Sequence, residues 1–140
     1  MANLVVEAKR VNQKVRFNGV CESHPEIVIP MDYSAPLGDG EGLAGLEVLL
    51  ASFAGCVSTA VVGLLKRAKK QIEDYAMRVE GIRREQPLSL QEIQARIRIK
   101  SPDIAAADMD GILKYAEAIS PVWLAIKNNV AVQITYEITQ

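Results

Sequence analysis

The chain has 140 residues, 49% of them apolar and 24% charged, a length and balance that suit one globular domain and exclude extensive disorder. Its 16 basic and 17 acidic residues give a net charge of −1, without the basic surplus that nucleic-acid binding requires. The N-terminus lacks a signal-peptide pattern, and the longest apolar stretch, residues 43–65, is too amphipathic for a membrane span. We therefore expect a cytoplasmic protein with no nucleic-acid or membrane partner.

The first thirty residues predict strands. Apolar and polar side chains alternate over residues 15–21, and the polar residues 11–14 before them suit a hairpin loop. Residues 27–29 are expected to form a short third strand that ends at Pro30. A loop rich in proline, glycine and aspartate follows, to about Gly42.

The strongest helical pattern comes next. Apolar residues recur at three- and four-residue spacing from Leu46 to Leu65, which predicts one long helix. Beside this stripe runs a second one of small residues, namely Ser52, Gly55, Cys56, Thr59 and Gly63. A glycine inside a helix costs about 1 kcal/mol relative to alanine, so their repetition indicates close approach of another helix. We expect this helix to be buried on two sides.

Two strands, two helices and a last strand complete the chain. Clean alternation over residues 93–99 predicts an antiparallel sheet with one solvent-exposed face, and residues 75–84 are the hairpin partner. A helix is expected from about Ala107 to Ile119. Ser120 and Pro121 then look like the N-cap and first residue of a short helix to about Lys127, followed by a strand over residues 130–138. The order βββ-α-ββ-αα-β, without repeats or a linker, predicts a single α+β domain over residues 1–140.

Most motifs that carry chemistry are missing. The glycines of residues 38–42 lack the lysine of a phosphate-binding loop. His24 is the only histidine and lies in a turn-like context, which argues against a His-rich zinc site and against most Ser-His-Asp triads. We expect no metal and no cofactor, so the two thiols remain as candidates.

Cys56 allows two interpretations. Free cysteine is often simply a small buried apolar residue of a helix. Its small neighbours, however, leave room around the sulfur. Cys56 lies about three turns into the helix, beyond the reach of the dipole, so a stabilised thiolate would need an arginine or lysine from elsewhere.

Residues 47–59 resemble the helix signature of the OsmC/Ohr family, the osmotically inducible and organic hydroperoxide resistance proteins. The shared features are a glutamate, a short aliphatic run, Ala/Ser and then Gly-Cys. Residues 14–19 and 116–122 support the resemblance, and the element order agrees along the chain. The resemblance implies an OsmC-like fold with antiparallel sheets around a long central helix, and a domain-swapped homodimer in which two such helices cross.

The resemblance also implies a thiol peroxidase, in which a cysteine attacks a hydroperoxide and an arginine, oriented by a glutamate, favours the thiolate. Cys56 matches the attacking cysteine. Glu47 is the candidate glutamate, although it precedes Cys56 by nine positions rather than the usual ten. Arg10 and Arg16 are both candidates for the arginine, and we prefer Arg16.

Ser120 occupies the position of the resolving cysteine, before Pro-Val, which implies a branch of the family that lacks this cysteine. Cys21 is an alternative partner for Cys56, but its strand face favours a core position. We therefore expect a one-cysteine peroxidase that reduces organic or small hydroperoxides through Cys56 and is regenerated by an external thiol. The alternative is a non-catalytic dimer that binds a small apolar ligand or senses oxidants stoichiometrically.

Overall fold

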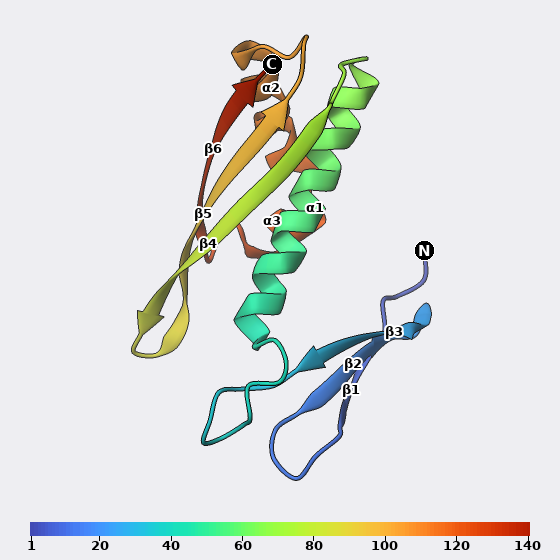
Figure 1. Cartoon of the computed structure of the whole chain (residues 1–140), viewed down its shortest axis with the longest axis vertical. Helices are drawn as coiled ribbons and strands as arrows, with labels where there is room; N and C mark the ends of the chain where they lie inside the picture. Colours follow the sequence, from blue (N-terminus) through green and yellow to red (C-terminus); the bar gives the residue numbers. More distant parts are fainter. The chain divides into compact units, whose positions relative to one another are not determined.

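The computed structural model describes residues 1–140, which form two compact units: an N-terminal unit, residues 1–48, and a C-terminal unit, residues 49–140 (Figure 1). The elements follow the predicted order βββ-α-ββ-αα-β. The single domain expected over residues 1–140 stays a prediction.

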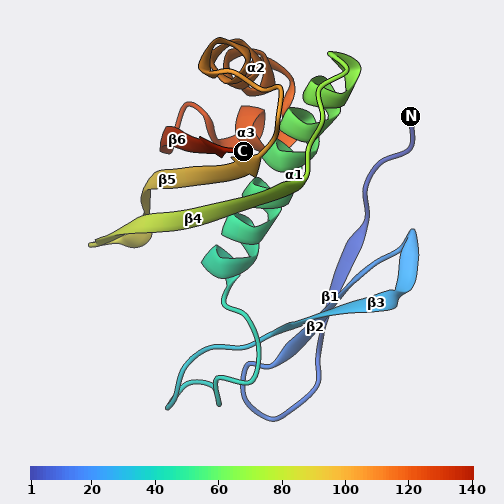
Figure 2. The same cartoon turned by 45° about the horizontal axis from the view of Figure 1, so that its top comes forward.

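The N-terminal unit is an antiparallel sheet of β1 (Val6–Arg10), β2 (Phe17–Cys21) and β3 (His24–Met31), in that spatial order. The predicted hairpin between β1 and β2 is confirmed. Residues 32–42 form a loop closed at its base, where the Leu43 N–H donates to the carbonyl of Pro30 over 2.9 Å. Figures 1 and 2 show this loop and the β1–β2 loop at the same end of the sheet.

No apolar side chain of the N-terminal unit is buried. Every buried hydrophobic residue of the chain lies in the C-terminal unit. Most of the exposed large apolar side chains, by contrast, belong to the N-terminal unit: Met1, Leu4, Val5, Val6, Val11, Ile27, Val28, Ile29, Tyr33, Leu37 and Leu43. A sheet with so much exposed apolar surface gains stability only when another surface covers it.

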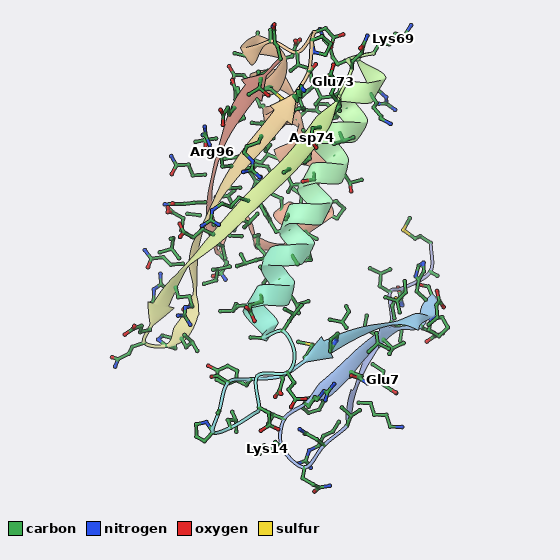
Figure 3. All side chains as sticks on the ribbon, viewed as in Figure 1. Glu7, Lys14, Lys69, Glu73, Asp74 and Arg96 are labelled. Atoms are coloured by element: carbon green, nitrogen blue, oxygen red, sulfur yellow. The ribbon has the colours of Figure 1, made fainter.

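The C-terminal unit packs helices on a three-stranded sheet. Helix α1 (Gly45–Arg67) begins in the N-terminal unit and continues in the C-terminal unit, where β4 (Asp74–Glu85), β5 (Leu88–Lys100), α2 (Ala106–Ile119), α3 (Pro121–Ile126) and β6 (Ala131–Thr139) follow. Figure 2 shows the helices on one face of the β4-β5-β6 sheet. As predicted, β5 buries alternate residues (Ile93, Ala95, Ile97 and Ile99), while Arg96, labelled in Figure 3, belongs to the exposed set.

The expected all-antiparallel arrangement is wrong for the last strand. β4 and β5 pair antiparallel, but β6 runs parallel to β5, from Glu92 opposite Ala131 to Lys100 opposite Thr139. Helices α2 and α3 form the crossover that a parallel pair requires. Alternation in the sequence indicates which face of a strand is buried, but it does not indicate the strand's direction.

Helix α1 has one buried stripe, made of Phe53, Val57, Val61 and Leu65. The small residues Ser52, Gly55, Thr59 and Gly63 are exposed. Burial on a second side therefore stays a prediction about the assembled protein. By length and composition α1 could cross a membrane, but a stripe of fully buried side chains is what a helix in a globular core requires.

Candidate functional site

Cys56 lies on α1 at the border between its buried stripe and its exposed small residues. Its side chain is half-buried and forms no disulfide. Phe53, three positions earlier, and Val57 beside it are fully buried. A Cβ atom added to Gly55 would meet nothing within 4 Å. The fold thus holds Cys56 beside the core, and next to it stands a glycine whose surroundings are open in the single chain.

Ser120 lies between α2 and α3 and is fully buried. It occupies the predicted N-cap position of α3, with Pro121 as the first helical residue, but its side chain makes no capping hydrogen bond. Its Oγ atom has no hydrogen-bond partner at all. A buried hydroxyl without a partner is unfavourable, so this site suits a less polar group better than a serine.

An aromatic contact joins the helix turn before Cys56 to α3. The rings of Phe53 and Trp123 pack edge to face, with centroids 5.8 Å apart. Both side chains are buried, as expected for core residues. The contact fixes α1 against the short helix that Ser120 precedes.

A polar network that the sequence did not indicate lies two residues beyond Cys56. The Tyr75 hydroxyl donates to Ser58 Oγ over 2.9 Å, and Ser58 Oγ lies 3.9 Å from Met77 Sδ. Burial raises the pKa of Tyr75, which keeps its hydroxyl protonated as a donor. The only indication in the sequence was that Tyr75 occupies one of the alternate strand positions whose side chains face the core. The network ties α1 to β4 and so fixes the rotation of the helix that carries Cys56.

The two candidate arginines have different partners within the N-terminal unit. Arg10 donates to the backbone carbonyls of Gln13 and Lys14 and so holds the β1–β2 loop. Arg16 forms an ion pair with Glu41, with Nη1 3.1 Å from Oε2. Its Nε atom is enclosed and has no hydrogen-bond partner. Of the two, only Arg16 is paired with a carboxylate.

Glu47, the expected orienting carboxylate, is used at the start of α1. Its Oε1 atom accepts the Ala44 N–H over 2.8 Å, which satisfies one of the free donors at the helix N-terminus. No ion pair joins Glu47 to an arginine. The structure therefore does not bring Glu47 and Arg16 together, and Arg16 meets Glu41 instead.

Asp32 organises the loop that carries Glu41. Its buried carboxylate accepts backbone N–H groups from Tyr33 (2.7 Å), Glu41 (3.1 Å) and Asp39 (3.3 Å). The hydrogen bond from Glu41 above all, with the Arg16 charge nearby, holds the Asp32 pKa below its usual range. Asp32 was not among the residues predicted from the sequence, although an aspartate opening a Gly- and Pro-rich loop is a common anchor for such loops.

Cys21 ends β2 and is half-buried rather than a core residue. Its Sγ lies 3.2 Å from Ser23 Oγ, and this hydrogen bond lowers the Cys21 pKa. Ser23 Oγ also lies 2.9 Å from Nδ1 of His24, an exposed residue that begins β3. Cys21 and Cys56 belong to different units, and both are free thiols in the structure.

A shallow apolar cavity of about 430 Å³ lies in the N-terminal unit. Its lining includes Phe17, Met31 and Leu37. No three His, Cys, Asp or Glu side chains come together as a metal site would require. The cavity is therefore the main candidate in this unit for an apolar ligand.

A family model described as OsmC-like protein matches residues 38–135, which is well over half of the chain. The chain belongs to the OsmC-like family. No curated protein matches it. Solved structures do: an OsmC-like protein from Mycoplasma pneumoniae is 15% identical, with 99% of each chain covered and a TM-score of 0.83. A protein from Aquifex aeolicus is 20% identical; the match covers 99% of this chain and 98% of that chain, with a TM-score of 0.82.

The organic hydroperoxide resistance protein OhrB of Bacillus subtilis has the same fold, with 15% identity, 97% of this chain and 98% of that chain covered, and a TM-score of 0.64. The predicted membership and the α+β OsmC-like fold, with two small sheets and a long helix, are thereby confirmed. The OsmC-like family includes cysteine-based hydroperoxide reductases, and its members are typically dimers.

Proposed function

We propose that this OsmC-like protein reduces organic or small hydroperoxides through Cys56. The observation that carries the proposal is the place of Cys56: a free, half-buried thiol on the long helix of an OsmC-like fold, within the Gly-Cys motif of that helix. The family match supports the chemistry. Arg16 is the proposed cation that favours the thiolate, because its guanidinium has a carboxylate partner, whereas Arg10 is bound to loop carbonyls.

The reaction needs an external thiol. The Cys56 thiolate attacks the outer peroxide oxygen, the O–O bond breaks, and the sulfur is oxidised to a sulfenic acid while the alkoxide takes up a proton to become an alcohol. One external thiol then forms a mixed disulfide with Cys56 and releases water. A second one frees Cys56 and leaves as the oxidised reductant. Ser120 has no thiol with which to form an internal disulfide, which supports a one-cysteine cycle.

The test is turnover of cumene hydroperoxide with a dithiol reductant, together with intact mass after brief peroxide exposure in the presence of a sulfenate-trapping dione. The Cys56→Ser variant should lose both turnover and the trapped adduct. The Cys21→Ser variant is the matched control, since it removes the other thiol and should keep both. If the Cys56→Ser variant turned over peroxide as fast as the wild type, the proposal would be wrong.

We also propose that the protein works as a homodimer with exchanged N-terminal units. The N-terminal unit has no buried apolar side chain and a large exposed apolar surface, which a second copy would cover. Sedimentation should give the mass of two chains at micromolar concentration. A stable monomer at that concentration would contradict the dimer.

A non-catalytic role is the second candidate, and the apolar cavity of the N-terminal unit favours it. In this role the protein binds a small apolar molecule, or Cys56 is oxidised once per chain without turnover. The peroxide assay separates the two functions, because the non-catalytic protein consumes one equivalent at most. The two free cysteines agree with a reducing, cytoplasmic location.

A further inference from the structure

We infer that Glu41, anchored through Asp32, is the carboxylate that positions Arg16, in place of Glu47. The inference rests on the proposed function for its catalytic meaning, but the positioning itself is a property of the N-terminal unit alone. All of the residues involved lie within residues 1–48.

The Arg16 guanidinium is constrained at two points. Its Nε atom is enclosed without an acceptor, and its Nη1 atom lies 3.1 Å from Glu41 Oε2. Because Nε makes no hydrogen bond, the ion pair with Glu41 is the interaction that orients the terminal nitrogens of Arg16. The pair is partly exposed, with 37% of the Arg16 side chain and 59% of the Glu41 side chain accessible, so it adds little to stability. A positioning role can therefore be tested without unfolding the protein.

Asp32 fixes the position of the Glu41 backbone and so restrains the surface ion pair between Glu41 and Arg16. A carboxylate on a mobile loop would sample many positions, but the Glu41 backbone N–H is itself bonded to the buried Asp32 carboxylate. The loop is also tightly closed: a Cβ atom on Gly38 would lie 2.2 Å from the Tyr33 carbonyl oxygen and 2.3 Å from Asp32 Oδ1. A separate, exposed ion pair in the same loop, with Lys14 Nζ 2.5 Å from Asp39 Oδ1, involves neither Arg16 nor Glu41. Figure 3 shows Lys14 at the β1–β2 loop.

Arg16 stands directly before β2, and Phe17, the first residue of β2, pairs with Met31, the residue before Asp32. The strand register therefore places Arg16 beside the start of the Asp32 loop. Glu47 is occupied at the same time, since its Oε1 accepts the Ala44 N–H. The register of the sheet and the cap of α1 thus both assign the pairing role to Glu41.

The first readout needs no activity. In ¹H–¹⁵N spectra of the full chain, the Nε–Hε signal of Arg16, assigned with Arg16→Lys, should be protected from exchange because Nε is enclosed. Glu41→Gln should shift this signal and speed its exchange, and Asp32→Asn should do the same by releasing the loop. Asp39→Asn is the matched control: it breaks the neighbouring ion pair with Lys14 in the same loop and should leave the Arg16 signal in place.

The second readout is the peroxidase assay. Glu41→Gln should lower kcat/KM about tenfold, because a misplaced group can cost one to two orders of magnitude in rate, and Glu41→Asp should restore part of it. Asp39→Asn should retain the wild-type rate. An unchanged Arg16 signal in Glu41→Gln, or a shift in Glu47→Gln alone, would overturn the inference. If the wild type does not turn over, the proposed function fails, while the Arg16 signal still decides the positioning.

Discussion

Single residues of this chain depart from the pattern that their family motif predicts, and Ser120 is the clearest case. Its place in the sequence indicated an N-cap, and the backbone agrees, but the hydroxyl is buried without a partner. Glu47 shows the converse. The motif indicated an orienting carboxylate, and the side chain instead caps α1. Sequence position fixed the backbone role of each residue, whereas the polar partner of each side chain depends on neighbours distant in sequence.

Replacing Ser120 by alanine should stabilise the protein by about 1 kcal/mol, because it removes a buried hydroxyl that has no hydrogen bond and leaves only a small void. The measurement is urea unfolding followed by Trp123 fluorescence, with an unchanged slope. Ser89→Ala is the control, since its hydroxyl bonds to the Pro87 carbonyl away from α1, and it should change stability by less than about 0.5 kcal/mol. A loss of stability in Ser120→Ala would mean that the hydroxyl has a partner.

At the scale of elements, the periodic segments were predictable and their pairing was not. The three- and four-residue spacing of apolar residues from Leu46 to Leu65 predicted α1, and the alternation of Ile93 to Ile99 predicted β5. The parallel pairing of β6 follows from the crossover through α2 and α3, which a local pattern does not encode. The loop after β3 was recognised as a loop from its composition, but its anchor, Asp32, became apparent only from its three backbone partners.

The loop anchored by Asp32 should make the free energy of unfolding depend on pH in the acid range. Because the folded-state pKa of Asp32 lies below the unfolded value, the unfolded chain binds more protons between the two values. The contribution of Asp32 is therefore complete above the unfolded pKa, about 3.9, and is lost as the pH falls through the lower folded value. Urea midpoints of the wild type should thus fall more steeply below about pH 4 than those of Asp32→Asn.

Glu26→Gln is the control for this acid dependence. It neutralises an exposed carboxylate on β3 in the same unit and should keep the wild-type slope. Parallel curves for the wild type and Asp32→Asn would show that the Asp32 carboxylate does not gain from the loop amides.

At the scale of the whole molecule, the two units have opposite balances of apolar surface. The C-terminal unit has a complete core, and the N-terminal unit has none. Helix α1 belongs to both units and is buried along one stripe only. In the proposed dimer, a second copy would cover the exposed apolar surface of the N-terminal unit and the exposed side of α1.

Two glycines in equally open surroundings test this assembly. A Cβ atom on Gly55 of α1 or on Gly111 of α2 would meet nothing within 4 Å in the single chain. Alanine at either position should then stabilise its helix by about 1 kcal/mol. If two copies of α1 cross at the small residues beside Cys56, however, Gly55→Ala inserts a methyl group between the helices. We therefore predict that Gly111→Ala raises stability and leaves association unchanged, whereas Gly55→Ala weakens the dimer.

Sedimentation over a dilution series, with thermal unfolding of the same samples, measures both effects. Equal stabilisation by the two substitutions, with the dimer intact, would place any contact between copies away from Gly55, because only a crossing helix distinguishes the two sites.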